Sequence, residues 1–247
     1  MNVDLYHFEP NANGGKPIMA LHEKGIAFTS HWVDLLQFEQ HSPAYLQINP
    51  KGQVPTLVHN GIVITESTPM CEYIDDAFDG PPLRPAAPLE RWRMRVWMRF
   101  ADEYLGPSLS MTAWKRFIGP MMRLRNPDSL KAAVAAIPTE ERRIAWSTTI
   151  YDGFTEEQIT ESMRRLAVSA ARLEEALIHS PWLAGDSYSL ADIVVFNMAA
   201  ALPHIVPADA SPTRTPQLLD WIKRVGDRPA IKAALALSRN SLRPLRG

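Results

Sequence analysis

Hydrophobic and polar positions follow two different patterns along this chain, and the change falls near residue 85. Before it, short apolar stretches predict strands at residues 3–8, 27–33, 53–58 and 62–64 and helices at residues 16–24 and 67–78. Residues 10–15 are predicted to form a turn, and the Asn60-Gly61 pair is a strong signal for a tight β-hairpin. This order predicts an α/β unit with a mixed sheet.

Beyond residue 85 the apolar positions recur every three or four residues, which is typical of helices. Ser189-Leu190-Ala191-Asp192 is a variant of the capping box, and the apolar run at residues 193–201 that follows it predicts a buried helix. The clearest helical faces are formed by Met94, Trp97, Met98, Ala101 and Leu105, and by Ile159, Met163, Leu166, Ala170, Leu173 and Leu177. The second part of the chain is therefore predicted to be all helical.

The charge distribution changes at the same place as the periodicity. Residues 1–84 hold 4 Lys and Arg and 10 Asp and Glu, a net charge of −6. Residues 85–247 hold 22 Lys and Arg and 17 Asp and Glu, a net charge of +5. The prolines at positions 81, 82, 85 and 88 stiffen this connection and interrupt regular structure. We expect a domain boundary near residue 85; the alternative is a proline-rich loop inside one domain.

The composition excludes several classes of protein. Hydrophobic residues make up 46% of the 247 residues and charged residues 21%, which is typical of a globular chain. A net charge of −1 offers no basic field for nucleic acid or an anionic membrane, and no apolar run is long enough to span a bilayer. The single cysteine, Cys71, excludes an internal disulfide, and the histidine spacing suggests no metal site. We expect a cytoplasmic protein that binds neither nucleic acid nor membranes.

Two short motifs in the first part carry candidate binding chemistry. A cis Val54-Pro55 bond would turn the backbone groups of Val54 outward, where they could pair with an extended peptide. Glu66-Ser67 stands directly before a predicted helix, where Ser67 is a plausible N-cap. Helix N–H groups bind a carboxylate and a glutamate pairs with an ammonium, so this end suits an amino-acid zwitterion. The alternative is an ordinary hairpin followed by a capped helix.

These motifs, taken in order, resemble a known family. The segment NPKGQVPTLVHNGIVITES, the strand-helix-strand start, the later SLADIVVFN and the all-helical remainder are similar to the cytosolic glutathione transferases. The resemblance implies a thioredoxin-like, glutathione-binding domain at residues 1–84 and an all-helical, substrate-binding domain at residues 85–247. It also implies glutathione as cosubstrate and a dimer, formed with an identical or a related subunit.

A finer resemblance covers further segments, among them Phe38-Glu39-Gln40-His41-Ser42, Thr65-Glu66-Ser67-Thr68 and Leu83-Arg84-Pro85-Ala86. They are similar to the sphingomonad glutathione-dependent β-etherases of lignin breakdown. This resemblance implies cleavage of β-aryl ether bonds in lignin-derived aromatic α-keto ethers, by attack of the glutathione thiolate at the β carbon with release of a phenol. The alternatives are a general transferase that conjugates other hydrophobic electrophiles, and a binding protein without catalysis.

The family's glutathione contacts carry over by position. Val54 matches the residue whose backbone pairs with the cysteinyl part, and Pro55 matches the cis-proline. Glu66 and Ser67 match the γ-glutamyl site. The positions that contact the glycyl end or the tripeptide backbone are Gln40, His41 and Gln53.

The chain departs from the family at the start of the first helix, where a Tyr, Ser or Cys usually lies near the thiol. Residues 11–16 read Asn-Ala-Asn-Gly-Gly-Lys and carry no hydroxyl or thiol. The Asn13 amide and exposed N–H groups of Gly14 and Gly15 are the candidates to stabilise the thiolate. The alternative is that Asn13-Gly14-Gly15 is a flexible turn with an N-cap.

Aromatic and sulfur-containing side chains of the second part suggest a wall for an aromatic substrate. Met111, Trp114 and Phe117 form one such stretch, and Tyr151 lies in a predicted loop that could reach the pocket. Core packing is the alternative for this stretch, and packing is also the expected role of Cys71.

Overall fold

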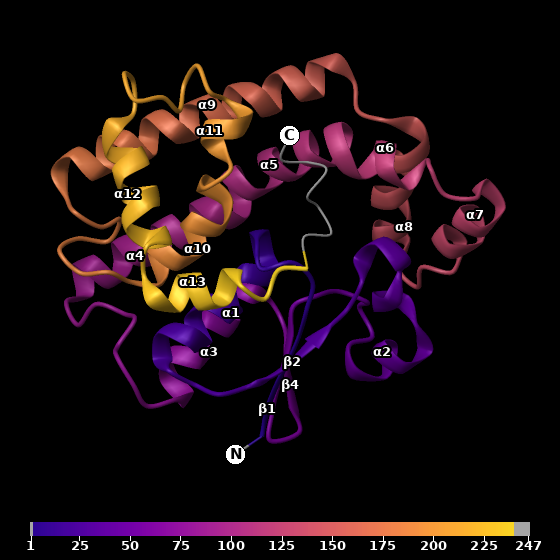
Figure 1. Cartoon of the computed structure of the whole chain (residues 1–247), viewed down its shortest axis with the longest axis horizontal. Helices are drawn as coiled ribbons and strands as arrows, with labels where there is room; N and C mark the ends of the chain where they lie inside the picture. The colour runs from indigo at the N-terminus through magenta and orange to yellow at the C-terminus, as the bar shows by residue number, and fades with distance from the viewer. Residues whose placement is uncertain (1, 240–247) are drawn as a thin grey trace.

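The sheet of this protein is small and mixed. The computed structural model describes residues 2–239 and shows four strands in the order β2-β1-β3-β4, with β1 at Val3–His7, β2 at Thr29–Trp32, β3 at Thr56–His59 and β4 at Ile62–Ile64 (Figure 1). β1 pairs in parallel with β2 and antiparallel with β3, and β3 pairs antiparallel with β4. Asn60 and Gly61 both have positive φ, which makes the predicted hairpin turn. The predicted mixed sheet is confirmed.

Helices α1 (Ala12–Lys24), α2 (Pro43–Ile48) and α3 (Ser67–Ala77) complete this part, with short 3-10 turns at Leu35–Gln37 and Glu39–His41. α1 and α3 pack against each other. α1 begins at Ala12, four residues before the predicted start, so the turn predicted at residues 10–15 is wrong. Pro17 lies inside the helix rather than in its first turn. Because Pro17 has no N–H, α1 lacks one backbone hydrogen bond near its N-terminus. The helix nevertheless continues past Pro17 to Lys24.

All regular elements between residue 85 and Leu235 are helices. One continuous helix runs from Pro88 to Met122 and is divided by two π-helical turns. Its parts are α4 (Pro88–Phe100), η3 (Ala101–Leu105), α5 (Gly106–Ala113), η4 (Trp114–Ile118) and α6 (Gly119–Met122). α7 (Pro127–Ala135) and α8 (Glu140–Ser147) follow, and α8 runs into the π-turn η5 (Thr148–Asp152). The remaining helices are α9 (Glu156–His179), α10 (Leu190–Ala199), α11 (Leu202–Ile205), α12 (Pro216–Gly226) and α13 (Pro229–Leu235). None of the helices in residues 2–239 has the length and apolar character of a membrane span.

Two groups of buried side chains hold the molecule together. The larger one extends from the sheet through α1 and α3 to α4, α9, α10 and α12. The smaller one lies apart from it and joins the 35–41 segment to α6, α7 and α8; its buried members are Phe38, Met122, Leu130, Val134, Ile137, Trp146 and Ile150. The helical half therefore contacts the sheet half at two places. The division into two domains at residue 85 stays a prediction, although the chain from Phe78 to Ala87 forms no helix or strand.

α10 is the most deeply placed helix, since every residue from Leu190 to Ala199 is buried. Its N-terminus carries the predicted capping box: Ser189 Oγ accepts from the Ala191 N–H (3.2 Å), and the Asp192 carboxylate accepts from the Ser189 N–H (2.9 Å). The same carboxylate also accepts from the Leu183 N–H (3.1 Å) and from Trp221 Nε1 (2.9 Å). Burial raises the pKa of Asp192 to about 6.

Replacing Asp192 by alanine removes the acceptor of all these donors at once. We expect Asp192→Ala to lower the free energy of unfolding by about 3–5 kcal/mol, because the buried donors are left without partners. Urea denaturation followed by circular dichroism measures this change. Asp186→Ala, an exposed aspartate in the same connection, is the control and should change stability by less than about 0.5 kcal/mol. Equal losses in the two variants would contradict this role of Asp192.

Candidate functional site

Strand directions bring four chain segments to one edge of the sheet. β1 and β2 are parallel, and β4 runs the same way as β1 because both are antiparallel to β3. The segments that leave these strands, and the segment that enters β3, therefore lie at the same edge. They contain the start of α1, residues 33–41, the Val54-Pro55 bond and the start of α3. Every residue expected to contact glutathione is in this set.

The start of α1 leaves backbone donors free. Its N-cap, Asn11, makes no side-chain cap bond, and the Gly15 N–H makes the first helical bond, to the Asn11 carbonyl (3.0 Å). The N–H groups of Asn13 and Gly14 precede that bond, and the Asn13 side chain is exposed. The expectation of an exposed N–H at Gly15 is wrong, because Gly15 is buried and its N–H is already bonded. Asn13 and Gly14 remain as candidate donors.

Gly15 has a packing reason for being glycine. A Cβ atom at this position would lie 1.8 Å from Oδ1 of Asn197 and 2.8 Å from the Pro10 carbonyl. Asn197, on α10, donates from Nδ2 to the Ile193 carbonyl (2.8 Å), and its buried Oδ1 has no partner. This asparagine therefore positions the start of α1. Its sequence signal is its place as the last residue of the SLADIVVFN segment.

The start of α3 is also uncapped. Glu66 is the N-cap residue and Ser67 is the first helical residue, so the prediction of Ser67 as N-cap is wrong. The first helical bond runs from the Met70 N–H to the Glu66 carbonyl (2.9 Å), which leaves the N–H groups of Ser67 and Thr68 unpaired within the helix. Glu66 has φ +66°, a strained conformation for a non-glycine residue. Two uncapped helix starts at one sheet edge favour the binding of anions.

Glu66 contacts another loop of the site. Its Oε1 lies 3.1 Å from Nζ of Lys51, and both side chains are exposed. An ion pair of this kind contributes little stability in water. The Glu66 carboxylate is therefore available to exchange Lys51 for the ammonium group of a ligand.

A buried cation, Lys16, links the starts of α1 and α3. Lys16 is fully buried, and its Nζ donates to Oδ1 of Asp102 (2.6 Å) and to Oγ1 of Thr68 (3.2 Å). Thr68 Oγ1 in turn donates to Asp102 (3.0 Å). This triad ties α1, α3 and the π-turn η3 together. Sequence reasoning missed it because its members are far apart in the chain and none belongs to a local motif.

The Val54-Pro55 bond is cis, as expected. The carbonyl of the preceding residue, Gln53, accepts from the Tyr45 hydroxyl (2.6 Å), from Asn49 Nδ2 (3.0 Å) and from Thr56 Oγ1 (3.2 Å). Burial raises the pKa of Tyr45 to about 12, so the phenol stays protonated and remains a donor. These bonds hold the loop in place while the Gln53 and Val54 side chains stay half-buried.

Gln40 and His41 end the 39–41 turn beside this loop. Gln40 is buried and its Oε1 has no partner, and neither ring nitrogen of His41 has one. Gly52 has φ +60°, and a Cβ atom there would lie 2.4 Å from Nδ1 of His41. Burial, and then the positive charge of Arg142, lower the pKa of His41 to about 4. His41 is therefore a neutral group with free hydrogen-bonding capacity next to the Val54-Pro55 loop.

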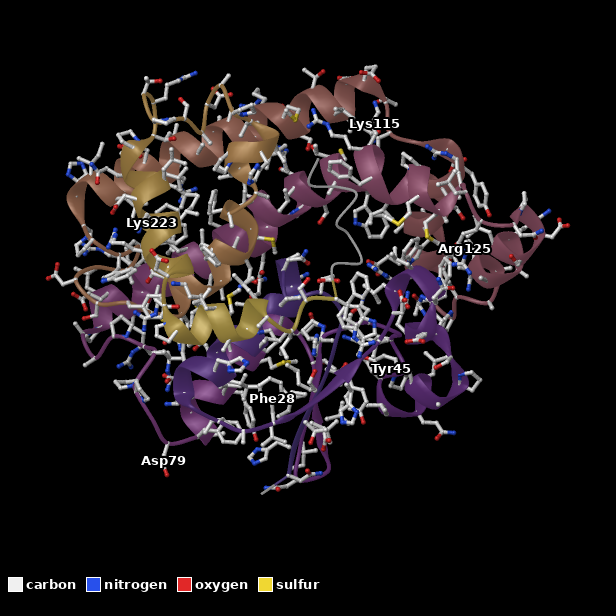
Figure 2. All side chains as sticks on the ribbon, viewed as in Figure 1. Phe28, Tyr45, Asp79, Lys115, Arg125 and Lys223 are labelled. Carbon is white, nitrogen blue, oxygen red and sulfur yellow. The ribbon has the colours of Figure 1, made fainter. Side chains whose placement is uncertain are left out.

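The four residues expected to bind an aromatic substrate lie on the helical half. Met111 is on α5, Trp114 and Phe117 are on η4, and all three are half-buried; Tyr151 on η5 is exposed. Trp114 packs against Trp146 (ring centroids 5.0 Å apart) at the edge of the smaller core. In Figure 2, Arg125 lies between this helical region and the part of the chain with Tyr45, and it donates to the Leu36 carbonyl. Contact of Met111, Trp114, Phe117 and Tyr151 with a substrate stays a prediction.

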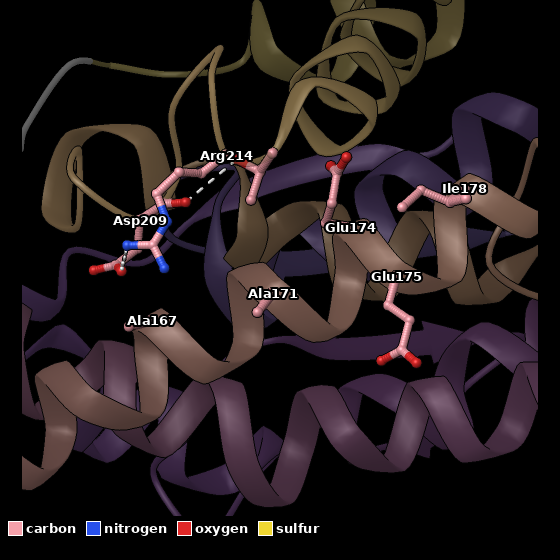
Figure 3. Close-up of a pocket in the computed structure, with 8 residues that line it drawn as sticks. Ala167, Ala171, Glu174, Glu175, Ile178, Asp209 and Arg214 are labelled. Carbon is pink, nitrogen blue, oxygen red and sulfur yellow. Dashed lines mark hydrogen bonds and ion pairs between the residues drawn. The ribbon is translucent and has the colours of Figure 1, made fainter.

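Two surface pockets lie away from this edge. One, of about 210 Å³, lies between α9 and the 209–215 segment (Figure 3). Most of its polar groups already have partners: Glu174 accepts from the backbone N–H of Leu218 (2.8 Å), and Asp209 pairs with Arg214 (2.8 Å). The other, of about 430 Å³, is lined by His22, Ile26, Phe28 and Leu237. The second pocket has one buried atom without a partner, Nε2 of His22, whereas the sheet edge has several. No group of three potential metal ligands occurs in residues 2–239.

The low pKa of His41 makes stability depend on pH. The folded state holds this imidazole neutral down to about pH 4, whereas the unfolded chain protonates it near pH 6.5. The contribution is therefore complete above pH 6.5 and is lost as the pH falls toward 4. Without ligand, the wild type should lose about 1–2 kcal/mol more than His41→Gln between pH 7 and pH 5. Urea denaturation at both pH values measures it; exposed His179→Gln is the control and should follow the wild type.

Comparison with known proteins gives the family. The glutathione S-transferase N-terminal domain model matches residues 13–77, and the corresponding C-terminal domain model matches residues 143–237. Protein LigF of Sphingobium sp. strain SYK-6 is 40% identical, covering 94% of this chain and 92% of its own. The crystal structure of beta-etherase LigF from the same organism superposes with a TM-score of 0.91 at 39% identity, over 96% of this chain and 100% of that one.

More distant proteins share the fold. Glutathione transferase F7 of Populus trichocarpa superposes with a TM-score of 0.72 at 23% identity, over 95% of this chain and 98% of its own. A transferase homolog from Sulfitobacter with bound glutathione does so with a TM-score of 0.68 at 19% identity, over 94% and 96%. The fold is a thioredoxin-like sheet unit followed by helices, and the chain belongs to the glutathione S-transferase family.

Proposed function

We propose that this protein cleaves β-aryl ether bonds of aromatic α-keto ethers with glutathione as the second substrate. The observation that supports it most is the likeness to LigF, a β-etherase, along nearly the whole of both chains at 39% to 40% identity. The family uses glutathione, and the sheet edge of this chain offers the groups that a tripeptide with two carboxylates, one ammonium and one thiol requires.

In this proposal the γ-glutamyl end of glutathione binds at the start of α3. The free N–H groups of Ser67 and Thr68 donate to the α-carboxylate, and Glu66 binds the ammonium in place of Lys51. The cysteinyl backbone pairs with Val54 in the manner of an added strand, next to cis Pro55. The buried Lys16 ammonium fixes the starts of α1 and α3 relative to each other through its bonds to Thr68 and Asp102.

The thiol then lies at the start of α1, which must stabilise the thiolate without a hydroxyl. A free thiol has a pKa of about 8.5, and lowering it by about two units requires roughly 2.7 kcal/mol. The exposed Asn13 amide, the free N–H of Gly14 and the dipole of α1 supply hydrogen bonds and positive potential there. Gly15 contributes through its contact with Asn197 rather than through its N–H.

The reaction is a displacement at the β carbon. The thiolate sulfur forms a bond to this carbon while the carbon–oxygen bond to the aryl group breaks, and the electron pair leaves with the phenolate, which takes a proton from water. The neighbouring carbonyl activates the carbon, and the protein aligns the two reactants. Met111, Trp114, Phe117 and Tyr151 are the proposed contacts of the aromatic rings.

Product analysis with a β-aryl ketone ether and glutathione tests this function. We expect free phenol together with a glutathione thioether at the β carbon. Finding no phenol with either β enantiomer, while a simple halogenated electrophile is conjugated readily, would contradict the ether-cleaving function and leave a general transferase.

Asn13→Ala tests the thiolate site in the same assay. We expect the rate at neutral pH to fall roughly 10–1000-fold, because a donor to the developing charge is lost, and to recover partly at higher pH. The control is Asn2→Ala, an exposed asparagine at the opposite edge of the sheet, which should keep the wild-type rate. A fast Asn13→Ala variant would assign thiolate stabilisation to the Gly14 N–H and the helix dipole instead.

The active form in this proposal is a dimer. Ile62 on the edge strand β4, and Leu89 and Trp92 on α4, are large apolar side chains that are more than half exposed. An exposed apolar edge strand favours association, and the opposite charges of the two halves can align two subunits.

Light scattering at micromolar concentration should give twice the 27.7 kDa chain mass. Trp92→Glu should shift it toward monomer, whereas Ile178→Glu, equally exposed on α9, should not; a monomeric wild type would refute the dimer.

A further inference from the structure

Arg142 on α8 is a cation of the helical half that has no acid bonded to it. Its Nε is buried without a hydrogen-bond partner, and burial lowers its pKa. Arg142 is half-buried as a residue, and leaving a buried donor of a charged group unpaired is unfavourable, so such atoms normally have a partner. The adjacent Arg143, by contrast, donates to the carbonyls of Ile137 and Pro138.

Packing of the smaller core brings Arg142 to the glutathione site. Trp146 is one helical turn after Arg142 and therefore lies on the same face of α8. The Trp146 ring packs on Phe38, with centroids 4.9 Å apart, and the Phe38 ring lies 6.3 Å from His41. The positive charge of Arg142 acts directly on the His41 imidazole.

Several further polar atoms at this junction lack partners. They are both ring nitrogens of His41 and the Oε1 of Gln40, whose residue is only 3% exposed. Leaving such a buried atom unpaired is unfavourable, and more so when the group is charged. The Arg142 guanidinium and the N–H of the neutral His41 imidazole are donors that match a carboxylate, with the guanidinium as the charged donor. The Gln40 Oε1 is an acceptor, which matches a backbone N–H of the ligand instead.

We propose that Arg142 binds the glycyl carboxylate of glutathione, so that the tripeptide links the sheet half to α8. The inference rests on the proposed use of glutathione. The tripeptide runs from Glu66 past Val54, and Gly52, at the far end of this loop, is in contact with His41. Extended residues advance by about 3.3 Å each, so the last of three residues ends near this junction.

Calorimetry with two ligands tests the assignment: glutathione, and γ-glutamylcysteine, which lacks the glycyl residue. The wild type should bind glutathione more tightly than γ-glutamylcysteine. Arg142→Gln should weaken glutathione binding roughly 10–100-fold and leave γ-glutamylcysteine binding unchanged, because only glutathione carries a carboxylate at the glycyl position. Arg142→Lys should recover part of the loss. Arg116→Gln, an exposed arginine on η4, is the matched control and should bind both ligands like the wild type.

Each other outcome overturns the inference in a recognisable way. If Arg142→Gln binds glutathione as tightly as the wild type, Arg142 has no part in binding while the proposed function stands. If it loses both ligands equally, or unfolds at lower urea than Arg116→Gln, Arg142 has a structural role only. If the wild type binds neither ligand, the proposed function fails together with the inference.

Discussion

The close approach of α10 to α1 sets the position of the candidate site. Gly15 has no side chain, and this lets Asn197 of the buried helix α10 reach the backbone of α1. One residue later, Lys16 carries its charge inward to Thr68 and Asp102. The start of α1 is therefore fixed from one side by helix packing and from another by a buried ion pair. A change at either contact displaces the donors of Asn13 and Gly14 from the sheet edge.

The site is built largely from groups that the fold leaves unpaired. Two helices begin without side-chain caps, Glu66 pairs only with an exposed lysine, and the ring nitrogens of His41 and Nε of Arg142 are buried without hydrogen-bond partners. In the core, by contrast, the buried carboxylate of Asp192 accepts from Leu183, Ser189 and Trp221. Under the proposed function, a charged tripeptide supplies the partners that these groups lack.

Sequence reasoning was most successful where signals are local. The hairpin at Asn60-Gly61, the capping box at Ser189 and the cis bond before Pro55 are confirmed, because each depends on a few adjacent residues. It was wrong about the start of α1 and about Ser67 as N-cap, because helix limits depend on how neighbouring elements pack. It also assigned the Gly15 N–H to a ligand, although the first helical bond of α1 uses it.

The sequence by itself determined the strand and helix order, the family resemblance and the candidate residues at this edge of the sheet, since these follow from periodicity and short motifs. Only the tertiary structure decided which of those residues are free to bind. Lys16, Thr68 and Asp102 meet from three separate elements, and Arg142 is carried to His41 by the packing of Trp146 on Phe38. Such contacts join residues 34 to 108 positions apart. No local pattern encodes them, because they form only when the helical half closes onto the sheet.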